Sequence, residues 1–171
     1  MTNLINEELE KRGLTVKAHP CHRLDRDTSG LIIYAKGKKN QQKVMDLFHN
    51  NLINKRYFAV ASGLIEKKEG SINFNIEGKN AITKYKVIKQ TSDFTSLDIE
   101  LLTGRTNQIR IHFKMIGHPL LGETKFAFRK DFKIKLKKLA LHSRQIEFIH
   151  PITNEKLTLE SSIPEEFLKF I

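Results

Sequence analysis

Two carboxylates and two arginines lie within five positions near the start of the chain, at Arg23, Asp25, Arg26 and Asp27. The turn-forming residues 28–30 follow directly and lead into an apolar run. A rigid turn before a strand holds the preceding polar groups with little freedom, as chemistry at a strand end requires. Flanking guanidinium groups favour the ionised form of a carboxylate, and an ionised carboxylate serves as a nucleophile or base. Asp25 is therefore the first candidate for a catalytic residue.

The same stretch has two other interpretations. Mixed runs of Asp and Arg commonly form solvated surface ion pairs of little energetic consequence, and the charge pattern alone leaves that interpretation open. A calcium loop of the EF-hand type would use Asp25, Asp27, Ser29 and Gly30 as its first ligand positions. The bidentate glutamate that closes such a loop is replaced by Lys36 here, which excludes calcium.

The order of residues in this stretch also carries a resemblance. His22-Arg23-Leu24-Asp25, followed by two residues and Thr28-Ser29-Gly30, resembles the signature of the RluA family of RNA pseudouridine synthases. The resemblance implies that Asp25 is the catalytic aspartate and that Arg23 enters the gap left by a flipped nucleotide. It also assigns substrate binding to the neighbouring motif residues, which are His22, Arg23, Leu24 and Thr28.

Three further blocks carry the same resemblance. The element Lys55-Arg56-Tyr57 resembles a Lys-x-Tyr block whose tyrosine packs against the target base, which implies that role for Tyr57. Residues 104–112 resemble a block whose Gln-Ile-Arg arginine, here Arg110, pairs with the catalytic aspartate. Asn107 stands where many family members have histidine. In the Leu-His-Ser element, the resemblance implies that Leu141 lines the uracil pocket.

Without the resemblance, the same residues have ordinary structural interpretations. A tyrosine in a strand most often belongs to the core, and Arg105 and Arg110 fit a solvated helix start. The helix expected after Gly104 would end at Gly117, with Ile109, Phe113 and Ile116 on its inner face and Arg110 off that stripe. Its free amide donors beside Arg105 predict a site for an RNA phosphate.

The implied reaction makes defined demands on the protein. Pseudouridine formation breaks the bond between ribose C1′ and uracil N1 and rejoins the base through C5, so no group enters or leaves. It needs a carboxylate, a dry pocket and an extruded uridine, and it needs neither a metal nor an organic cofactor. The alternative function is a catalytically silent RNA-binding module of the same fold.

Composition favours a polyanionic partner. The chain of 171 residues has a formal charge of +11 and a pI near 9.8, which predicts binding to nucleic acid; the resemblance implies that this is ribosomal or transfer RNA. A single cysteine, Cys21, excludes an internal disulfide and fits a reducing compartment. The absence of a long apolar stretch or signal peptide predicts a cytoplasmic protein without a membrane partner. The spacing of His19, Cys21 and His22 fits no closed zinc site.

Periodicity and turn signals predict an α+β fold with a mixed, mostly antiparallel sheet and flanking helices. One catalytic domain is expected over residues 1–171, shortened at the N-terminus relative to the family and without a separate N-terminal RNA-binding domain. Helices are expected over 3–12, from a cap at Asn40 to about 50, from 106 or 107 to 117, and after Pro164. Strands are expected over 31–35, 55–63, 71–76, 82–89, 94–102, 145–149 and 156–159, with a further strand of one basic face within 129–138.

Overall fold

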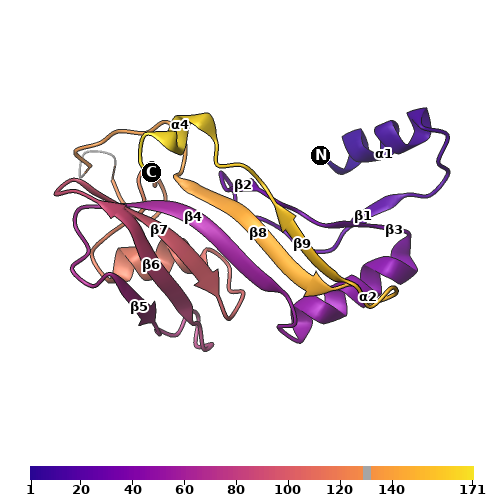
Figure 1. Ribbon diagram of the computed structural model, residues 1–171, viewed down its shortest axis with the longest axis horizontal. Coiled ribbons are helices and arrows are strands. Elements are labelled where there is room, and N and C mark those ends of the chain that lie inside the picture. Colours follow the sequence, from indigo (N-terminus) through magenta and orange to yellow (C-terminus); the bar gives the residue numbers. More distant parts are fainter. Residues whose placement is uncertain (129–131) are drawn as a thin grey trace. The chain divides into compact units, whose positions relative to one another are not determined.

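The computed structural model describes residues 1–128 and 132–171, and this part of the chain is mixed α and β (Figure 1). Its helices are α1 (Thr2–Lys11), α2 (Lys38–His49), α3 (Gln108–Met115) and α4 (Glu165–Leu168). Its strands are β1 (Ala18–Pro20), β2 (Ser29–Gly30), β3 (Tyr34–Lys36), β4 (Asn54–Ser62), β5 (Glu69–Ile72), β6 (Thr83–Gln90), β7 (Phe94–Leu101), β8 (Leu141–Ile149) and β9 (Lys156–Glu160). The predicted α+β class is confirmed. None of these helices is long and apolar enough to cross a membrane.

Most of the strands belong to one sheet. Its order is β2-β8-β4-β7-β6-β5, with β9 paired to β8, among the residues that the structure describes. The pairs β4–β7, β6–β7 and β5–β6 are antiparallel, and β2–β8 is parallel. The sheet is therefore mixed and mostly antiparallel, as predicted.

The chain also divides into two compact units, one made of residues 1–24, 32–53 and 147–158 and the other of the remaining segments.

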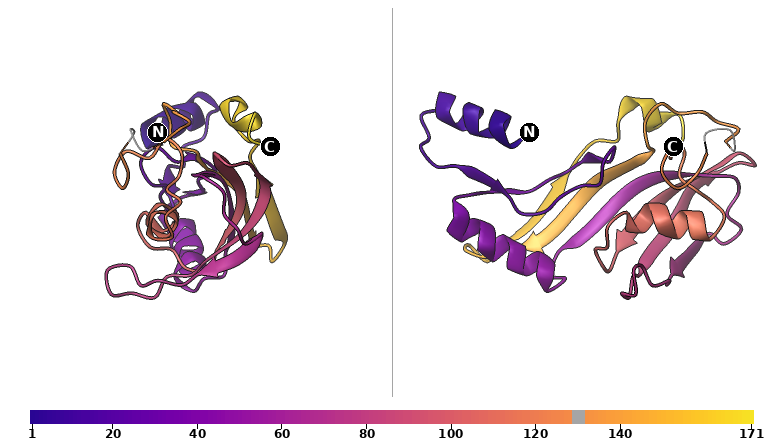
Figure 2. Two further views of the ribbon diagram at one scale, coloured as in Figure 1. Left: turned by 90° about the vertical axis from the view of Figure 1, so that its left-hand side faces the viewer. Right: turned by 180° about the vertical axis from the view of Figure 1, so that it is seen from behind.

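The larger unit has apolar layers on both faces of β4, because successive side chains of a strand point to opposite faces. Ala59 and Ala61 belong to the cluster that contains Ile109 and Phe113 of α3. Phe58 and Val60 instead join a cluster of aromatic residues from the C-terminal segment, Phe167 and Phe170. The right-hand view of Figure 2 shows α3 lying across one face of this part of the sheet. These two layers hold β4, and hence Tyr57, in place.

The smaller unit contains α1, α2 and the two-stranded sheet of β1 and β3. Cys21, Ala35 and Val44 form its buried cluster. Burial raises the pKa of the Cys21 thiol, with a smaller opposing effect of the backbone at Ala35, so this cysteine is held in its less reactive form. His22 also belongs here, and its Nε2 accepts a hydrogen bond of 2.9 Å from the Ile33 N–H.

Two predicted elements differ from the observed ones at the N-terminal side. The strand expected over 31–35 is replaced by β2 and β3, because the residues on either side of 31–33 pair with different strands, β8 and β1. Helix α2 begins at Lys38 after Gly37, whose φ is 81°. Asn40 therefore lies inside the first turn, where its amide donates to the Lys36 carbonyl at 2.8 Å, and it is not the cap.

The predicted basic strand is not formed among residues 132–138. Phe132, Ile134 and Leu136 pack against the cluster around Phe58, whereas Lys133, Lys135 and Lys137 are exposed. The alternation of inward and outward side chains is therefore present, but the backbone of this segment pairs with no strand. Arg129, Lys130 and Asp131, which completed the predicted basic segment, lie outside the described residues.

Candidate active site

Asp25 lies in a tight turn of the larger unit. The Thr28 N–H donates to the Asp25 carbonyl at 3.1 Å, and Asp27 has a φ of 70°, which matches the third position of a type II turn. Asp25 is half-buried, whereas Arg26 and Asp27 are exposed. The turn thus separates one partly shielded carboxylate from one that faces water. This difference favours Asp25 over Asp27 as the reactive group.

Strand β2 attaches this turn to β8. Ser29 lies opposite His142 and Gly30 opposite Ser143, and the Ser29 hydroxyl is 2.9 Å from His142 Nδ1. Gly30 has a φ of 108°, and a Cβ on it would lie 2.2 Å from the Ser143 carbonyl oxygen. Only glycine fits such an approach. The contact places the Asp25 turn beside Leu141, the residue predicted to line the uracil pocket.

Tyr57 comes from β4 and packs against the cluster that includes Leu141. Burial raises the pKa of Tyr57 to about 12; the nearby Asp25 carboxylate adds to the increase and the Ser143 hydroxyl opposes it. The Asp25 carboxylate is therefore close enough to Tyr57 to act electrostatically on its hydroxyl. Tyr57, Leu141 and Asp25 gather in one region, as the sequence motifs predicted.

Arg110 is buried, which excludes the solvated helix start as an interpretation of this residue. Its Nε and Nη2 donate to the Glu123 carboxylate at 2.7 and 2.6 Å. Its Nη1 donates to Asn107 Oδ1 at 3.1 Å and to the Arg26 carbonyl at 3.4 Å. Among the described residues its direct ionic partner is Glu123, in place of the predicted Asp25. Arg110 reaches the Asp25 turn through the backbone at Arg26.

Electrostatics link Arg110 to the turn as well. The hydrogen bond to Glu123 is the main cause of the raised pKa of Arg110, and the carboxylates of Asp25 and Asp27 contribute to it. The Arg110 guanidinium therefore interacts electrostatically with the Asp25 turn without contacting the Asp25 carboxylate.

Glu123 is a site residue that sequence motifs did not identify. Its side chain is fully buried, and its Oε1 also accepts from the backbone N–H groups of Thr124, Lys125 and Phe126 at 2.9, 2.7 and 3.3 Å. Burial alone would raise the pKa of Glu123, but the Arg110 pair and the backbone donors outweigh it and lower the pKa. Glu123 thus anchors the guanidinium. A sequence signal existed: Glu123 is the single acidic residue within 101–130.

The start of α3 differs from the predicted one. Asn107 precedes the helix with a φ of 55° and makes no capping hydrogen bond, because its amide oxygen accepts from Arg110. The buried Gln108 side chain instead accepts from the Arg105 N–H at 3.0 Å and donates to the Ile82 carbonyl at 3.0 Å. Arg105 is half-buried, and its Nε donates to the Asn80 carbonyl at 2.9 Å. Phosphate binding at Arg105 stays a prediction.

The remaining predicted substrate-binding residues lie on either side of Asp25 in the sequence. Arg23 is exposed and Leu24 half-buried, and both belong with His22 to the smaller unit. The His22 ring lies 4.5 Å from the Phe48 ring. Thr28 belongs to the larger unit, and its buried Oγ1 makes no hydrogen bond within the described residues. The structure thus brings Thr28 together with Asp25, and places His22 in the packing around α2.

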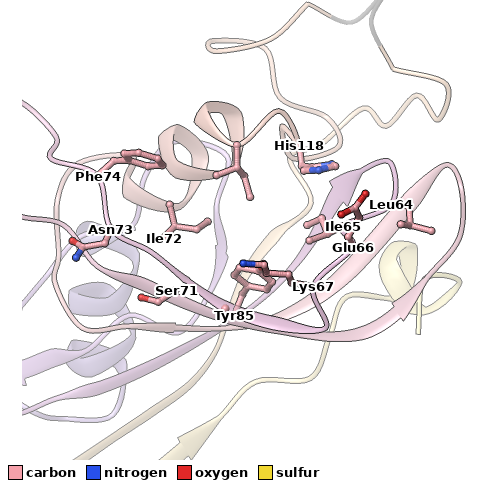
Figure 3. A pocket seen from close by; sticks show the side chains of 12 residues that line it. Leu64, Ile65, Glu66, Lys67, Ser71, Ile72, Asn73, Phe74, Tyr85 and His118 are labelled. Carbon is pink, nitrogen blue, oxygen red and sulfur yellow. The ribbon is translucent and has the colours of Figure 1, made fainter.

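A separate cavity of about 580 Å³ opens in the larger unit. Figure 3 shows Asn73 and Phe74 toward one side of it and His118 and Leu64 toward the other, with Ile72 and Tyr85 between them. Neither Asp25, Tyr57 nor Arg110 lines it. This cavity is therefore distinct from the group of residues around Asp25.

Comparison with solved structures defines the class of fold. The structure described as Human RNA Pseudouridylate Synthase Domain Containing 1 matches with a TM-score of 0.80 at 22% identity, covering 100% of this chain and 78% of that chain. Human RNA Pseudouridylate Synthase Domain Containing 4 gives a TM-score of 0.80 and covers 98% of this chain and 79% of that chain. The fold is that of pseudouridylate synthase domains.

Sequence comparison then defines the family. The family profile described as RNA pseudouridylate synthase matches residues 3–115. The uncharacterized RNA pseudouridine synthase YlyB of Bacillus subtilis is 37% identical over 164 residues, covering 88% of this chain and 54% of the relative. The dual-specificity RNA pseudouridine synthase RluA of Vibrio cholerae is 32% identical, with coverages of 81% and 62%. The chain belongs to the RNA pseudouridylate synthase family, which confirms the predicted membership. It spans between about half and two thirds of the length of these relatives.

Proposed function

We propose that this protein is an isomerase that converts specific uridines of structured RNA to pseudouridine, with Asp25 as the catalytic carboxylate. The observation that carries the proposal is that three residues gather in one region: Asp25 from the turn before β2, Tyr57 from β4 and Leu141 from β8, with Arg110 hydrogen-bonded to that turn. Family membership supports it. The net charge of +11 fits an RNA substrate.

Each residue has a proposed part in the reaction. Asp25 acts at ribose C1′ or assists formation of a glycal intermediate, and either route uses its ionised form. Tyr57 and Leu141 form walls around the detached uracil. Arg110 holds the turn that carries Asp25 through the Arg26 carbonyl, and Arg23 fills the space left by the extruded nucleotide. The RNA is ribosomal or transfer RNA, and the reaction takes place in the cytoplasm without a metal or an organic cofactor.

The activity can be tested directly. Purified protein is incubated with unmodified ribosomal and transfer RNA, and pseudouridine is mapped by carbodiimide labelling and primer extension. We expect new pseudouridine at a small set of positions that depends on protein concentration and time. Binding without any conversion would support the silent RNA-binding module instead.

The role of the Tyr57 ring makes a separate prediction. Tyr57→Phe should keep turnover within about threefold, whereas Tyr57→Leu should lower kcat/KM by roughly 5- to 150-fold, since base–aromatic stacking is worth about 1–3 kcal/mol. Because the pKa of Tyr57 is about 12, its hydroxyl stays protonated between about pH 5 and pH 10. The wild-type rate should therefore show no titration of this group over that range. A Phe variant as impaired as the Leu variant would assign the function to the hydroxyl.

A further inference from the structure

Lys55, to which the sequence motifs assigned no role, is a buried cation at the beginning of β4. The residue is 9% exposed, its ammonium nitrogen keeps some contact with solvent, and this group forms no hydrogen bond or ion pair with residues 1–128 or 132–171. Burial lowers its pKa, and no carboxylate opposes that effect. A cation that is largely withdrawn from water and has no counter-charge is unfavourable. Such a group is expected where a ligand of opposite charge completes the site.

The position of Lys55 relates it to the candidate active site. Lys55 and Tyr57 are two residues apart in one strand, so their side chains leave the same face of β4. Arg56 lies opposite Glu100 near the end of β7, which brings Lys55 beside the residues that follow β7. The Lys55 Nζ lies 3.7 Å from the point where a Cβ on Gly104 would stand. The ammonium group therefore faces bare backbone next to Arg105.

The surroundings are suited to an anion. Gly104 is exposed and carries no side chain, so a ligand can approach the backbone closely. Arg105 uses its Nε for the Asn80 carbonyl, and its terminal nitrogens have no protein acceptor within the described ranges. The chain then enters α3, and the free amides and dipole of a helix start favour negative charge. Lys55 and Arg105 thus place two positive charges beside the bare backbone of Gly104, on the Tyr57 side of β4.

We propose that Lys55, with Gly104 and Arg105, binds an RNA phosphate adjacent to the uridine that Tyr57 covers. This inference rests on the proposed function, and it adds a backbone-binding subsite to it. The phosphate supplies the counter-charge that Lys55 lacks. Because Lys55 and Tyr57 are two residues apart in β4, the spacing along the strand sets the distance between the phosphate and the base. The subsite holds the nucleotide in register with Asp25 without reading its sequence.

Salt-dependent binding tests the proposal. RNA affinity is measured in the Asp25→Asn background, which removes turnover, with a uridine-containing RNA over a series of salt concentrations. Adding Lys55→Met should weaken binding about tenfold, as expected for loss of one charged hydrogen bond. It should also reduce the slope of log K against log salt by about 0.7 to 0.9. Lys55→Arg should keep the slope. Lys84→Met, at an exposed position of β6, is the matched control and should change the slope little.

A second measurement uses the unchanged lysine, in case Lys55→Met does not fold. Acylation of lysines with and without bound RNA is read by mass spectrometry, and RNA should protect Lys55. Unaltered slope and affinity in a folded Lys55→Met protein, or equal labelling of Lys55 in both states, would overturn the proposal. Both measurements concern binding alone. A protein that binds RNA through Lys55 but converts no uridine would instead contradict the proposed function.

Discussion

Replacing Asp25 with asparagine should abolish pseudouridine formation, to below about one ten-thousandth of the wild-type rate, while RNA affinity changes by less than about twofold. The substitution keeps the shape of the side chain but removes the charge that either route requires. Single-turnover kinetics with excess enzyme separate this loss from any effect on binding or product release.

Asp27→Asn is the matched control. Asp27 is exposed and has a φ of 70°, a conformation that asparagine tolerates well. The control loses the same charge from the same turn, and we expect it to retain turnover within about tenfold. Full turnover by Asp25→Asn would contradict the catalytic assignment, and equal loss in both variants would mean that the turn's net charge matters more than the position of one carboxylate.

Glu123→Gln should produce the largest loss of stability among the substitutions considered. It leaves the Arg110 guanidinium buried without its counter-charge. The new NH2 group must also face donors in either orientation, Arg110 Nε on one side or three backbone N–H groups on the other. Breaking a buried ion pair from one side typically costs about 3–5 kcal/mol. For a chain of this size the melting temperature should fall by roughly 6 to 20 °C. Urea unfolding monitored by circular dichroism measures the free energy.

An exposed pair provides the control for Glu123. Glu166 accepts from Lys138 at 2.9 Å, and their side chains are 40% and 72% exposed. Glu166→Gln should therefore cost less than about 1 kcal/mol. Similar losses of unfolding free energy in the two Gln variants would show that the Arg110–Glu123 pair contributes no more than a surface pair.

The same pair predicts a dependence on pH. Because the folded state lowers the pKa of Glu123, the stabilisation is complete above the unfolded-state pKa of about 4.3 and is lost as the pH falls through the lower folded-state value. The wild-type protein should lose more stability than Glu123→Gln on acidification below that pH. Parallel curves for the two proteins would contradict the assignment.

Local patterns predicted the elements that hold Tyr57 and Arg110. Alternating side chains located β4, β6 and β7 within a few residues, and the Gly104 and Gly117 boundaries located α3. Those signals depend only on neighbours in the sequence. The bounds of β2 and β3 depend on which distant strands they pair with. The apolar run at 31–33 therefore wrongly predicted a single strand over 31–35.

The composition of the site was harder to predict than its position. The motif around Asp25 indicated the carboxylate, and the resemblance of the Lys55-Arg56-Tyr57 element indicated Tyr57. The partner of Arg110 lies 13 positions away in an irregular segment, where no periodicity marks which side chain turns inward. The same limit applies to Lys55, whose missing partner is visible only once burial is known.

The pairing of Gly30 with Ser143 has a consequence for how the protein becomes functional during its synthesis. The turn that carries Asp25 is synthesised more than a hundred residues before the backbone of β8 that holds it in place. A nascent chain that ends before β8 would carry the aspartate on a loose loop. Such a chain should not act on RNA near the ribosome until the last strands have emerged and docked.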